Sequence, residues 1–249
     1  MPIVNFTNVY DDEQRARAYA DLGFPGTYHL AFRDIPQLLR DHVTGNRALD
    51  FGCGAGRSTR FLKELGYHVI GVDVSESMLH EAAARDPDGQ YFLLRDGFEA
   101  LGERRFDLVL CAFPFDNIAA AERAGTFRRL AERLTPTGRI VNLVSSADIY
   151  VNEWLSFSTR KFPANRHARS GDIVRIVMLD GADQRPVEDI YWTDSDYAET
   201  FAAAGLQLIH VHRPLGNESD PFDWVSERTI SPWVIHILAC HFPLPTSHS

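Results

Sequence analysis

Three glycines at alternate positions, Gly52, Gly54 and Gly56, constrain most strongly what this chain can fold into. The apolar run at residues 48–51 precedes them and predicts a buried strand, and an apolar helical periodicity over residues 59–65 follows. A strand, a glycine turn and a helix in this order open a nucleotide-binding α/β unit. Glycine is needed because the backbone must turn tightly and let a ligand approach, which a Cβ would prevent.

The spacing of the glycines differs from that of a dinucleotide-binding turn. The dinucleotide fingerprint is G-x-G-x-x-G, whereas this chain has G-x-G-x-G with an acid, Asp50, two residues before the first glycine. The next predicted strand, residues 67–73, ends in Asp73, about 20 residues beyond the turn, where a carboxylate can accept hydrogen bonds from ribose hydroxyls.

Residues 50–56, Asp-Phe-Gly-Cys-Gly-Ala-Gly, resemble the acidic glycine motif of the class I S-adenosylmethionine-dependent methyltransferases. The resemblance extends over residues 45–145 and includes residues 74–79, which look like the family's usual continuation after the ribose-binding acid. It implies an α/β fold with a doubly wound, seven-stranded, mostly parallel sheet of Rossmann-like type, and S-adenosylmethionine as the cofactor. The overall pattern is also similar to that of bacterial natural-product N-methyltransferases of the toxoflavin type.

The resemblance implies a cofactor-binding role for particular residues. Asp73 would bind the ribose hydroxyls, and Asp96 and the backbone amide of Gly97 would meet the adenine just past a third strand at residues 90–94. An ordinary loop between strand and helix is the alternative for Asp96 and Gly97. The implied set is Tyr28, Asp50, Gly52, Gly54, Gly56, Asp73, Val74, Met78, Asp96, Gly97, Phe98, Ala112 and Phe113. The product would be S-adenosylhomocysteine.

The length of 249 residues fits one sizeable α/β domain. The net charge of −9 disfavours a nonspecific nucleic-acid binder, which needs a basic face. The cysteines, Cys53, Cys111 and Cys240, have no metal-ligand spacing and favour a reducing, cytoplasmic compartment. No leader pattern and no run of about 18 apolar residues is present, so neither secretion nor membrane binding is expected. The oligomeric state stays open.

The domain is expected to have four parts: an N-terminal helical cap (residues 1–44), the cofactor-binding core (45–145), an insertion and hairpin cap (146–192) and the C-terminal part of the sheet (193–249). Helices are predicted over residues 11–22, 28–42, 77–85 (N-cap Ser75), 127–134 and 194–204 (capped by Thr193 or Asp194). Strands are predicted over residues 106–113, 139–144 (after a turn at 135–138), 172–178, 186–192, 206–212 and 231–238, the last being antiparallel.

The segment after the strand at residues 106–113 separates several classes of methyltransferase. It reads Pro114-Phe115-Asp116-Asn117 and lacks the double proline of nucleic-acid amino-methylating enzymes. Catechol-type methyltransferases bind a metal through an Asp-Asn pair, but that family places the pair after a different strand. The histidines show no metal-ligand spacing either. We therefore expect no metal, and a helix-cap or hydrogen-bonding role for Asp116.

Aromatic residues outside the minimal core predict a pocket for a small, flat acceptor. The candidates for substrate binding are Tyr10, Tyr19, Phe115, Tyr150, Trp154 and Trp224, and for each of them simple packing is the alternative. Tyr19, Asp116 and the histidines of the C-terminal half are candidate bases, so the catalytic residue stays open.

The expected function is methyl transfer from S-adenosylmethionine to a small, planar N- or O-acceptor by in-line displacement. The alternatives are methylation of a protein or nucleic acid, and a regulatory protein that binds S-adenosylmethionine without catalysis. The identity of the acceptor and the reacting atom are not determined by the sequence.

Overall fold

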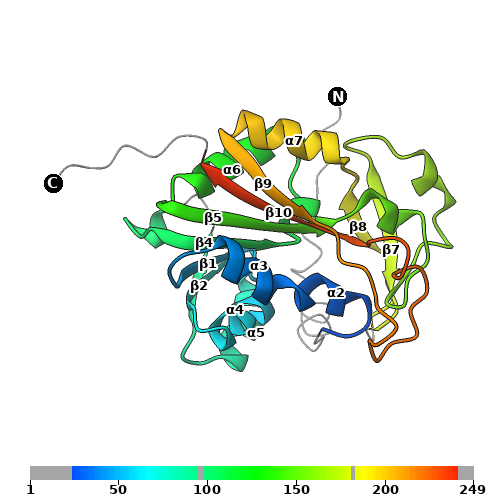
Figure 1. The fold of residues 1–249 in the computed structure, drawn as a ribbon, viewed down its shortest axis with the longest axis horizontal. Helices are drawn as coiled ribbons and strands as arrows, with labels where there is room; N and C mark the ends of the chain where they lie inside the picture. The colour runs from blue at the N-terminus through cyan, green and yellow to red at the C-terminus, as the bar shows by residue number, and fades with distance from the viewer. Residues whose placement is uncertain (1–23, 95–97, 181–182, 241–249) are drawn as a thin grey trace.

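A seven-stranded sheet forms the centre of the molecule in a computed structural model that describes residues 24–94, 98–180 and 183–240 (Figure 1). The strand order is β3-β2-β1-β4-β5-β10-β9. The strands are β1 (Arg47–Phe51), β2 (His68–Asp73), β3 (Gln90–Leu93), β4 (Phe106–Ala112), β5 (Leu134–Ser145), β9 (Leu206–His212) and β10 (Trp233–Cys240). Neighbouring strands from β3 to β5 pair in parallel, and β10 pairs antiparallel with both β5 and β9. The predicted doubly wound α/β fold is confirmed.

Helices cover both faces of this sheet. They are α2 (Thr27–Arg33), α3 (Ile35–His42), α4 (Arg57–Glu64), α5 (Glu76–Arg85), α6 (Ala120–Ala131) and α7 (Asp194–Ala203). Side chains of α2, α3 and α4 belong to one buried apolar cluster, and those of α6 and α7 belong to a second. Figure 1 shows α7 at the top of the view and α2 and α3 below the strands. The two clusters are the two layers that a doubly wound sheet needs, because both of its faces are apolar.

A second, three-stranded sheet lies at one end of the main sheet, where Figure 1 shows β7 and β8 on the right. Its strands are β6 (Phe157–Ser158), β7 (Ile173–Met178) and β8 (Val187–Ile190), in the order β6-β7-β8. The antiparallel pairing of β7 with β8 confirms the predicted hairpin. Short 3₁₀ turns flank it: η3 (Pro114–Asp116) follows β4, and η4 (Ala147–Tyr150) follows β5.

Two helix predictions need correction. The helix predicted over residues 28–42 is divided into α2 and α3 at Asp34, because Pro36 has no N–H to donate back to the preceding turn. The helix predicted over residues 127–134 is α6, which begins at Ala120 and ends at Ala131. Its first two turns carry no apolar stripe, so periodicity misses them, although alanine, glutamate and arginine favour a helix. The helix predicted over residues 11–22 lies outside the described residues.

The strands also end differently from the prediction in two places. Residues 135–138, predicted as a turn, lie within β5, at a point where its register with β4 shifts. Pro136 has no N–H for a regular ladder there. The strand predicted to reach Phe113 ends at Ala112, because Phe113 has a left-handed backbone. By contrast, the predicted cap at Thr193 is confirmed as a capping box with Asp196.

Candidate functional site

The glycine turn lies at the carboxyl end of β1. Gly52, Gly54 and Gly56 have φ angles of 73°, 52° and 77°, which residues with a Cβ rarely adopt. A Cβ on Gly52 would lie 2.7 Å from Cβ of Pro114, so the turn also packs closely on η3. The amides of Gly52 and Cys53 both donate to the carbonyl of Val72 on β2. The turn is therefore fixed between two strand ends, where ligands bind in such a sheet.

Asp50 lies fully buried beneath the turn. One of its carboxylate oxygens accepts hydrogen bonds from Ser58 Oγ at 2.7 Å and Thr59 Oγ1 at 2.6 Å. The other oxygen, Oδ1, has no hydrogen-bond partner among the described residues. Burial raises the pKa of this carboxyl group to about 6. A buried oxygen without a partner fits a site in which a bound polar ligand, directly or through water, completes the hydrogen bonding.

Asp73 ends β2 next to the glycine turn. Its Oδ2 accepts a hydrogen bond from the amide of Gly54 at 2.8 Å, and its Oδ1 accepts one from the amide of Ser75 at 2.9 Å. These bonds hold the carboxylate in one orientation, and a carboxylate has further lone pairs that can accept ribose hydroxyls. The ribose-binding role of Asp73 stays a prediction that this geometry suits.

Other residues of the predicted cofactor set surround the same turn. The methyl of Met78 lies 3.0 Å from where a Cβ of Gly54 would be, and Val74 is 63% exposed beside Asp73. The ring of Phe98 stacks on that of Phe51 with centroids 6.0 Å apart. Asp96 and Gly97 lie outside the described residues. The narrow glycine backbone, the fixed carboxylate of Asp73 and the unpaired oxygen of Asp50 together fit S-adenosylmethionine.

Phe113 has an unusual backbone at the end of β4. Its φ is 72°, and it is the only non-glycine residue with a positive φ in the described part of the chain. Its amide donates to the carbonyl of Leu143 on β5 at 2.8 Å, which holds this conformation. The ring then lies against Tyr28 and Trp233, with centroids 5.9 and 4.9 Å away. Backbone strain of this kind is typical of functional sites.

A small cavity of about 60 Å³ opens beside Phe113, between the ends of β4 and β5 and the hairpin β7–β8. We name it the acceptor cavity. It is lined by Tyr28, Phe113, Asp116, Asn117, Ser145, Ile149, Tyr150, Phe157, Ile176, Met178, Val187, Asp189 and Trp233. Part of the lining is aromatic: Tyr28 stacks on Trp233 with centroids 5.6 Å apart, and its hydroxyl lies 3.7 Å from the sulfur of Met178. The lining also contains two acids.

These two acids, Asp116 and Asp189, come from different parts of the chain. Asp116 accepts hydrogen bonds from the amide of Ser145 at 3.1 Å and from the hydroxyl of Tyr197 at 3.4 Å. Asp189, on β8, accepts one from the hydroxyl of Tyr150 at 3.1 Å. Burial raises the pKa of both carboxyl groups, and the nearby charge of Asp116 raises that of Asp189 further. The lining of the cavity therefore includes carboxyl groups that can hold or accept a proton.

The structure brings together only some of the residues predicted to bind substrate. Tyr150 lines the acceptor cavity. Phe115 does not: it is fully buried and stacks on Phe127 of α6, with centroids 3.7 Å apart. Trp154 is also buried away from the lining and donates through Nε1 to the carbonyl of Ile149.

The remaining substrate candidates do not line the cavity either, or cannot be placed. Trp224 hydrogen-bonds Asp220 on the loop before β10 and is not part of the lining. Tyr10 and Tyr19 lie outside the described residues. Packing, the alternative considered for each aromatic residue, therefore describes Phe115 and Trp154.

Sequence reasoning missed Asp189, Phe157, Met178 and Trp233. A signal for Asp189 exists, because Glu188 and Asp189 are adjacent in an alternating strand. Two adjacent acids on a strand face opposite sides, so one of them must point toward the main sheet. Asp189 is that residue, whereas Glu188 pairs with Arg175 on the exposed side.

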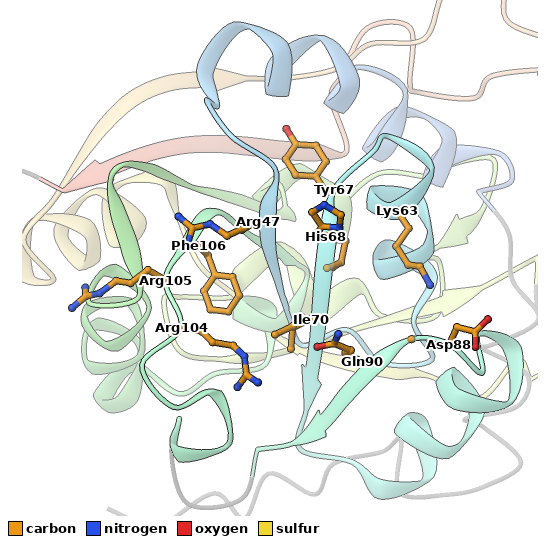
Figure 2. A pocket seen from close by; sticks show the side chains of 12 residues that line it. Arg47, Lys63, Tyr67, His68, Ile70, Asp88, Gln90, Arg104, Arg105 and Phe106 are labelled. Atoms are coloured by element: carbon orange, nitrogen blue, oxygen red, sulfur yellow. The ribbon is translucent and has the colours of Figure 1, made fainter.

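A larger cavity of about 460 Å³ lies at the opposite, amino-terminal edge of the strands (Figure 2). Figure 2 shows Arg47, Arg104 and Arg105 on one side of it and Lys63 and Asp88 on the other. Arg47 forms an ion pair with Asp107, and Lys63 forms one with Asp86. We place the functional site at the smaller cavity despite its size, because ligands bind at the carboxyl ends of the strands in this architecture.

No helix of the described residues has the length and apolarity needed to cross a membrane. The same residues contain no group of three or more His, Cys, Asp or Glu side chains that is arranged to hold a metal ion. The expectation that no metal is required stays a prediction.

The chain is similar to known methyltransferases in sequence and in fold. A family model described as a methyltransferase domain matches residues 48–138. N-demethylindolmycin N-methyltransferase of Streptomyces griseus is 25% identical over 218 residues, which cover 85% of this chain and 89% of that protein.

Two solved structures share the fold. The CcbJ methyltransferase of Streptomyces caelestis matches with a TM-score of 0.59 and 22% identity, over 87% of this chain and 98% of that one. The glycopeptide N-methyltransferase MtfA, solved with S-adenosylmethionine, matches with a TM-score of 0.60 and 16% identity, over 84% and 93%. Combined with the acidic glycine turn and the sheet order, these matches support a class I S-adenosylmethionine-dependent methyltransferase.

Proposed function

We propose that this methyltransferase acts on a small molecule whose reacting group enters the acceptor cavity. The observation that carries the proposal is the small size and the lining of that cavity. Aromatic rings line it from α2, β6, β10 and the residue after β4, and side chains of the hairpin β7–β8 line it as well. A narrow, walled cavity admits a small molecule or a single projecting group, whereas a folded RNA or protein surface needs a broad open face.

The chain's own residues have two tasks in this reaction. S-adenosylmethionine, when bound, supplies a methyl group already activated by the positive charge on sulfur. The glycine turn and Asp73 would hold the cofactor, and the rings of Tyr28, Phe113 and Trp233 would orient the acceptor and exclude water. Orientation of this kind can contribute roughly 7–11 kcal/mol to lowering the barrier.

The comparisons support the same substrate class. Two of the similar proteins are named as N-methyltransferases of N-demethylindolmycin and of a glycopeptide. The match to the first of them covers 85% of this chain and 89% of that protein. The net charge of −9 also makes a polyanion such as RNA an unfavourable partner.

The first test follows a labelled methyl group. The protein is incubated with S-adenosylmethionine labelled in its methyl group together with a bacterial extract, which is then separated by size and chemical class. Label in the small-molecule fraction is the expected result. Label confined to protein or RNA would overturn the proposal, and binding of the cofactor without any transfer would favour a regulatory role.

A second test fills the cavity without touching the glycine turn. Val187 lines the cavity from β8, so Val187→Phe is expected to remove turnover while leaving the affinity for S-adenosylmethionine unchanged. Leu179→Phe is the matched control, because Leu179 follows β7 and is 43% exposed outside the lining. Normal turnover in Val187→Phe would show that the acceptor binds elsewhere.

A further inference from the structure

Asp116 and Asp189 both line the acceptor cavity although they lie on separate segments, and the charge of Asp116 acts on Asp189. Asp116 belongs to η3 after β4, and Asp189 belongs to β8 of the covering hairpin. Their exposed fractions are 4% and 9%, so both carboxyl groups are nearly removed from solvent. It is energetically unfavourable for both carboxyl groups to be ionised at once, because they are buried and their charges repel each other.

The hydrogen-bond partners of both acids are neutral. Asp116 accepts from a backbone amide and from the hydroxyl of Tyr197, and Asp189 accepts from the hydroxyl of Tyr150. The neutral side chain of Asn117 also acts on Asp189. Neither acid forms an ion pair with any described residue within 4.0 Å. These donors orient the carboxylates but do not neutralise them.

The nearest described cation that acts on the pair, Arg123 of α6, is directed elsewhere. Its guanidinium lies over the rings of Trp192 and Tyr197, at 4.1 and 4.3 Å from their centroids. It reaches Asp116 only through a longer-range attraction. Within the described chain the two acids therefore have no ion-pair partner within 4.0 Å, and a cationic ligand can supply one.

The rest of the lining suits the same kind of ligand. The rings of Tyr28, Phe113 and Trp233 line the same cavity as the two acids and pack against one another. Aromatic faces attract cations, and more strongly where water is excluded. An ammonium group suits both the rings and the acids, because it brings a positive charge and N–H donors. A neutral hydroxyl or thiol has no positive charge to offer to either of them.

We propose that the acceptor is a basic amine, which the Asp116–Asp189 pair binds as its ammonium ion and deprotonates before methyl transfer. This proposal rests on the proposed small-molecule function and specifies its substrate class. An ammonium nitrogen has no lone pair, so it must lose a proton before it can act as a nucleophile. Asp189 is assigned as the acceptor of that proton, and Asp116 as the residue that sets its basicity.

The step balances in atoms and electrons. The N–H bond of the ammonium breaks, the proton moves to a carboxylate oxygen of Asp189, and the electron pair stays on nitrogen. That pair forms the new bond to the methyl carbon as the methyl–sulfur bond breaks, and sulfur keeps the electrons of the broken bond. The methylated ammonium carries the positive charge away, and the proton on Asp189 passes to solvent.

Several groups facing Asp189 influence its proton affinity. Asp116 and Asn117 face it from η3, Tyr150 from η4, Tyr197 from α7, and Arg123 acts more distantly from α6. Burial and the negative charge of Asp116 raise the pKa of Asp189, while the hydrogen bonds from Tyr150 and Asn117 lower it. Once ionised, a carboxylate with a raised pKa is a stronger base than an ordinary aspartate, and it can therefore take a proton from an ammonium ion.

The test compares amines with alcohols of the same shape. The wild type and Asp189→Asn are assayed with methyl-labelled S-adenosylmethionine against a library in which every primary or secondary amine is matched by the isosteric alcohol, phenethylamine with 2-phenylethanol among them. We expect label in amines alone. In Asp189→Asn we expect kcat to fall by about 100-fold or more, with partial rescue in Asp189→Glu.

Two controls separate a chemical role from a structural one. The affinity of Asp189→Asn for S-adenosylmethionine, measured by calorimetry, is expected to equal that of the wild type. Glu188→Gln changes the neighbouring acid on the exposed side of β8, where it pairs with Arg175, and is expected to keep wild-type turnover. The pH dependence of kcat should lose its lower limb in Asp189→Asn, which a merely structural role would not produce.

The outcomes distinguish this proposal from the one on which it rests. Label in alcohols or phenols but not amines would overturn the amine assignment and leave the small-molecule function standing. Label in RNA or protein alone would overturn both. Unchanged kcat and pH profile in Asp189→Asn would overturn the role of the acid pair. A library in which no amine takes label also contradicts the proposal.

Discussion

Thr27 Oγ1 donates a 2.6 Å hydrogen bond to Glu227 Oε1, although the two residues lie 200 positions apart in the sequence. The same carboxylate accepts hydrogen bonds from the amides of Leu155 and Val225, both at 2.8 Å. Glu227 is fully buried and joins α2, the insertion after β5 and the loop before β10. Because Tyr28 is the next residue on α2, this carboxylate also fixes one aromatic wall of the acceptor cavity.

Removing this junction should destabilise the protein. Glu227→Ala removes the acceptor of the buried Thr27 hydroxyl, and a buried donor left without a partner costs about 1–3 kcal/mol. It also removes the acceptor of two less buried amides, those of Leu155 and Val225. We expect the free energy of unfolding to fall by at least ~2 kcal/mol, measured by urea denaturation. Glu218→Ala is the control, because the Glu218 side chain is 82% exposed and pairs only with Arg228 at the surface. Equal denaturation midpoints for wild type and Glu227→Ala would contradict this role.

The glycine-turn half of the candidate site was predictable in its backbone geometry because its signals are local. The glycine turn, the acid that ends β2 and the cap at Ser75 each lie within a few residues, and each has one favoured backbone geometry. The order of the strands then follows from the fold that this turn opens. These elements need no knowledge of contacts distant in sequence.

The acceptor half was less predictable because it depends on which way side chains face. Phe113 and Phe115 are equally aromatic, yet the left-handed backbone at Phe113 directs its ring toward Tyr28 while Phe115 packs on α6. In the hairpin, a shift of one residue would exchange Glu188 with Asp189. Only the packing of the hairpin against the main sheet decides which acid is buried, and that packing has no local signature.

The glycine turn allows a matched comparison of two glycines. Gly52 and Gly205 both have a φ of 73°, but a Cβ on Gly52 would meet Pro114 at 2.7 Å, whereas a Cβ on Gly205 has no neighbour within 4 Å. Gly205→Ala should therefore cost only the backbone strain, about 1–2 kcal/mol, and keep wild-type cofactor affinity. Gly52→Ala should add a displacement of the turn and weaken binding of S-adenosylmethionine by at least ~10-fold, an energy of about 1.4 kcal/mol. Equal calorimetric affinities in the two variants would show that the turn does not contact the cofactor.

Asp73 is expected to contribute directly to cofactor affinity. Asp73→Asn keeps the size of the side chain and removes the charge and one acceptor oxygen, so a ribose hydroxyl loses a hydrogen bond worth about 1–3 kcal/mol. Calorimetry should show binding of S-adenosylmethionine weakened by roughly 5- to 150-fold. Asp88→Asn, an exposed acid before β3, should bind as the wild type does. Unchanged affinity in Asp73→Asn would remove this residue from the cofactor site.

The buried acid on β8 should make stability fall as the pH rises. The pKa of Asp189 is raised to about 8 from its ordinary value near 3.8, chiefly because burial disfavours its charge. The folded protein therefore binds this proton more tightly than the unfolded chain does. The resulting stabilisation is complete below about pH 4 and is lost as the pH rises toward 8.

Between pH 6.5 and 8, Asp189 should contribute most to the pH dependence of the free energy of unfolding. The raised pKa values of Asp50 and Asp116 lie at about 6, so these groups have largely finished titrating. His236, whose pKa is lowered to about 4 from 6.5, adds only a small slope of opposite sign near pH 6.5, where the unfolded chain releases that proton. We expect wild-type stability to fall by up to ~2 kcal/mol across this interval, because a full proton difference is worth about 1.4 kcal/mol per pH unit. Asp189→Asn should be nearly flat and more stable than wild type at pH 8, while Glu188→Gln should keep the wild-type slope. Thermal unfolding curves of the three proteins that run parallel across the interval would show that Asp189 is already ionised in the fold.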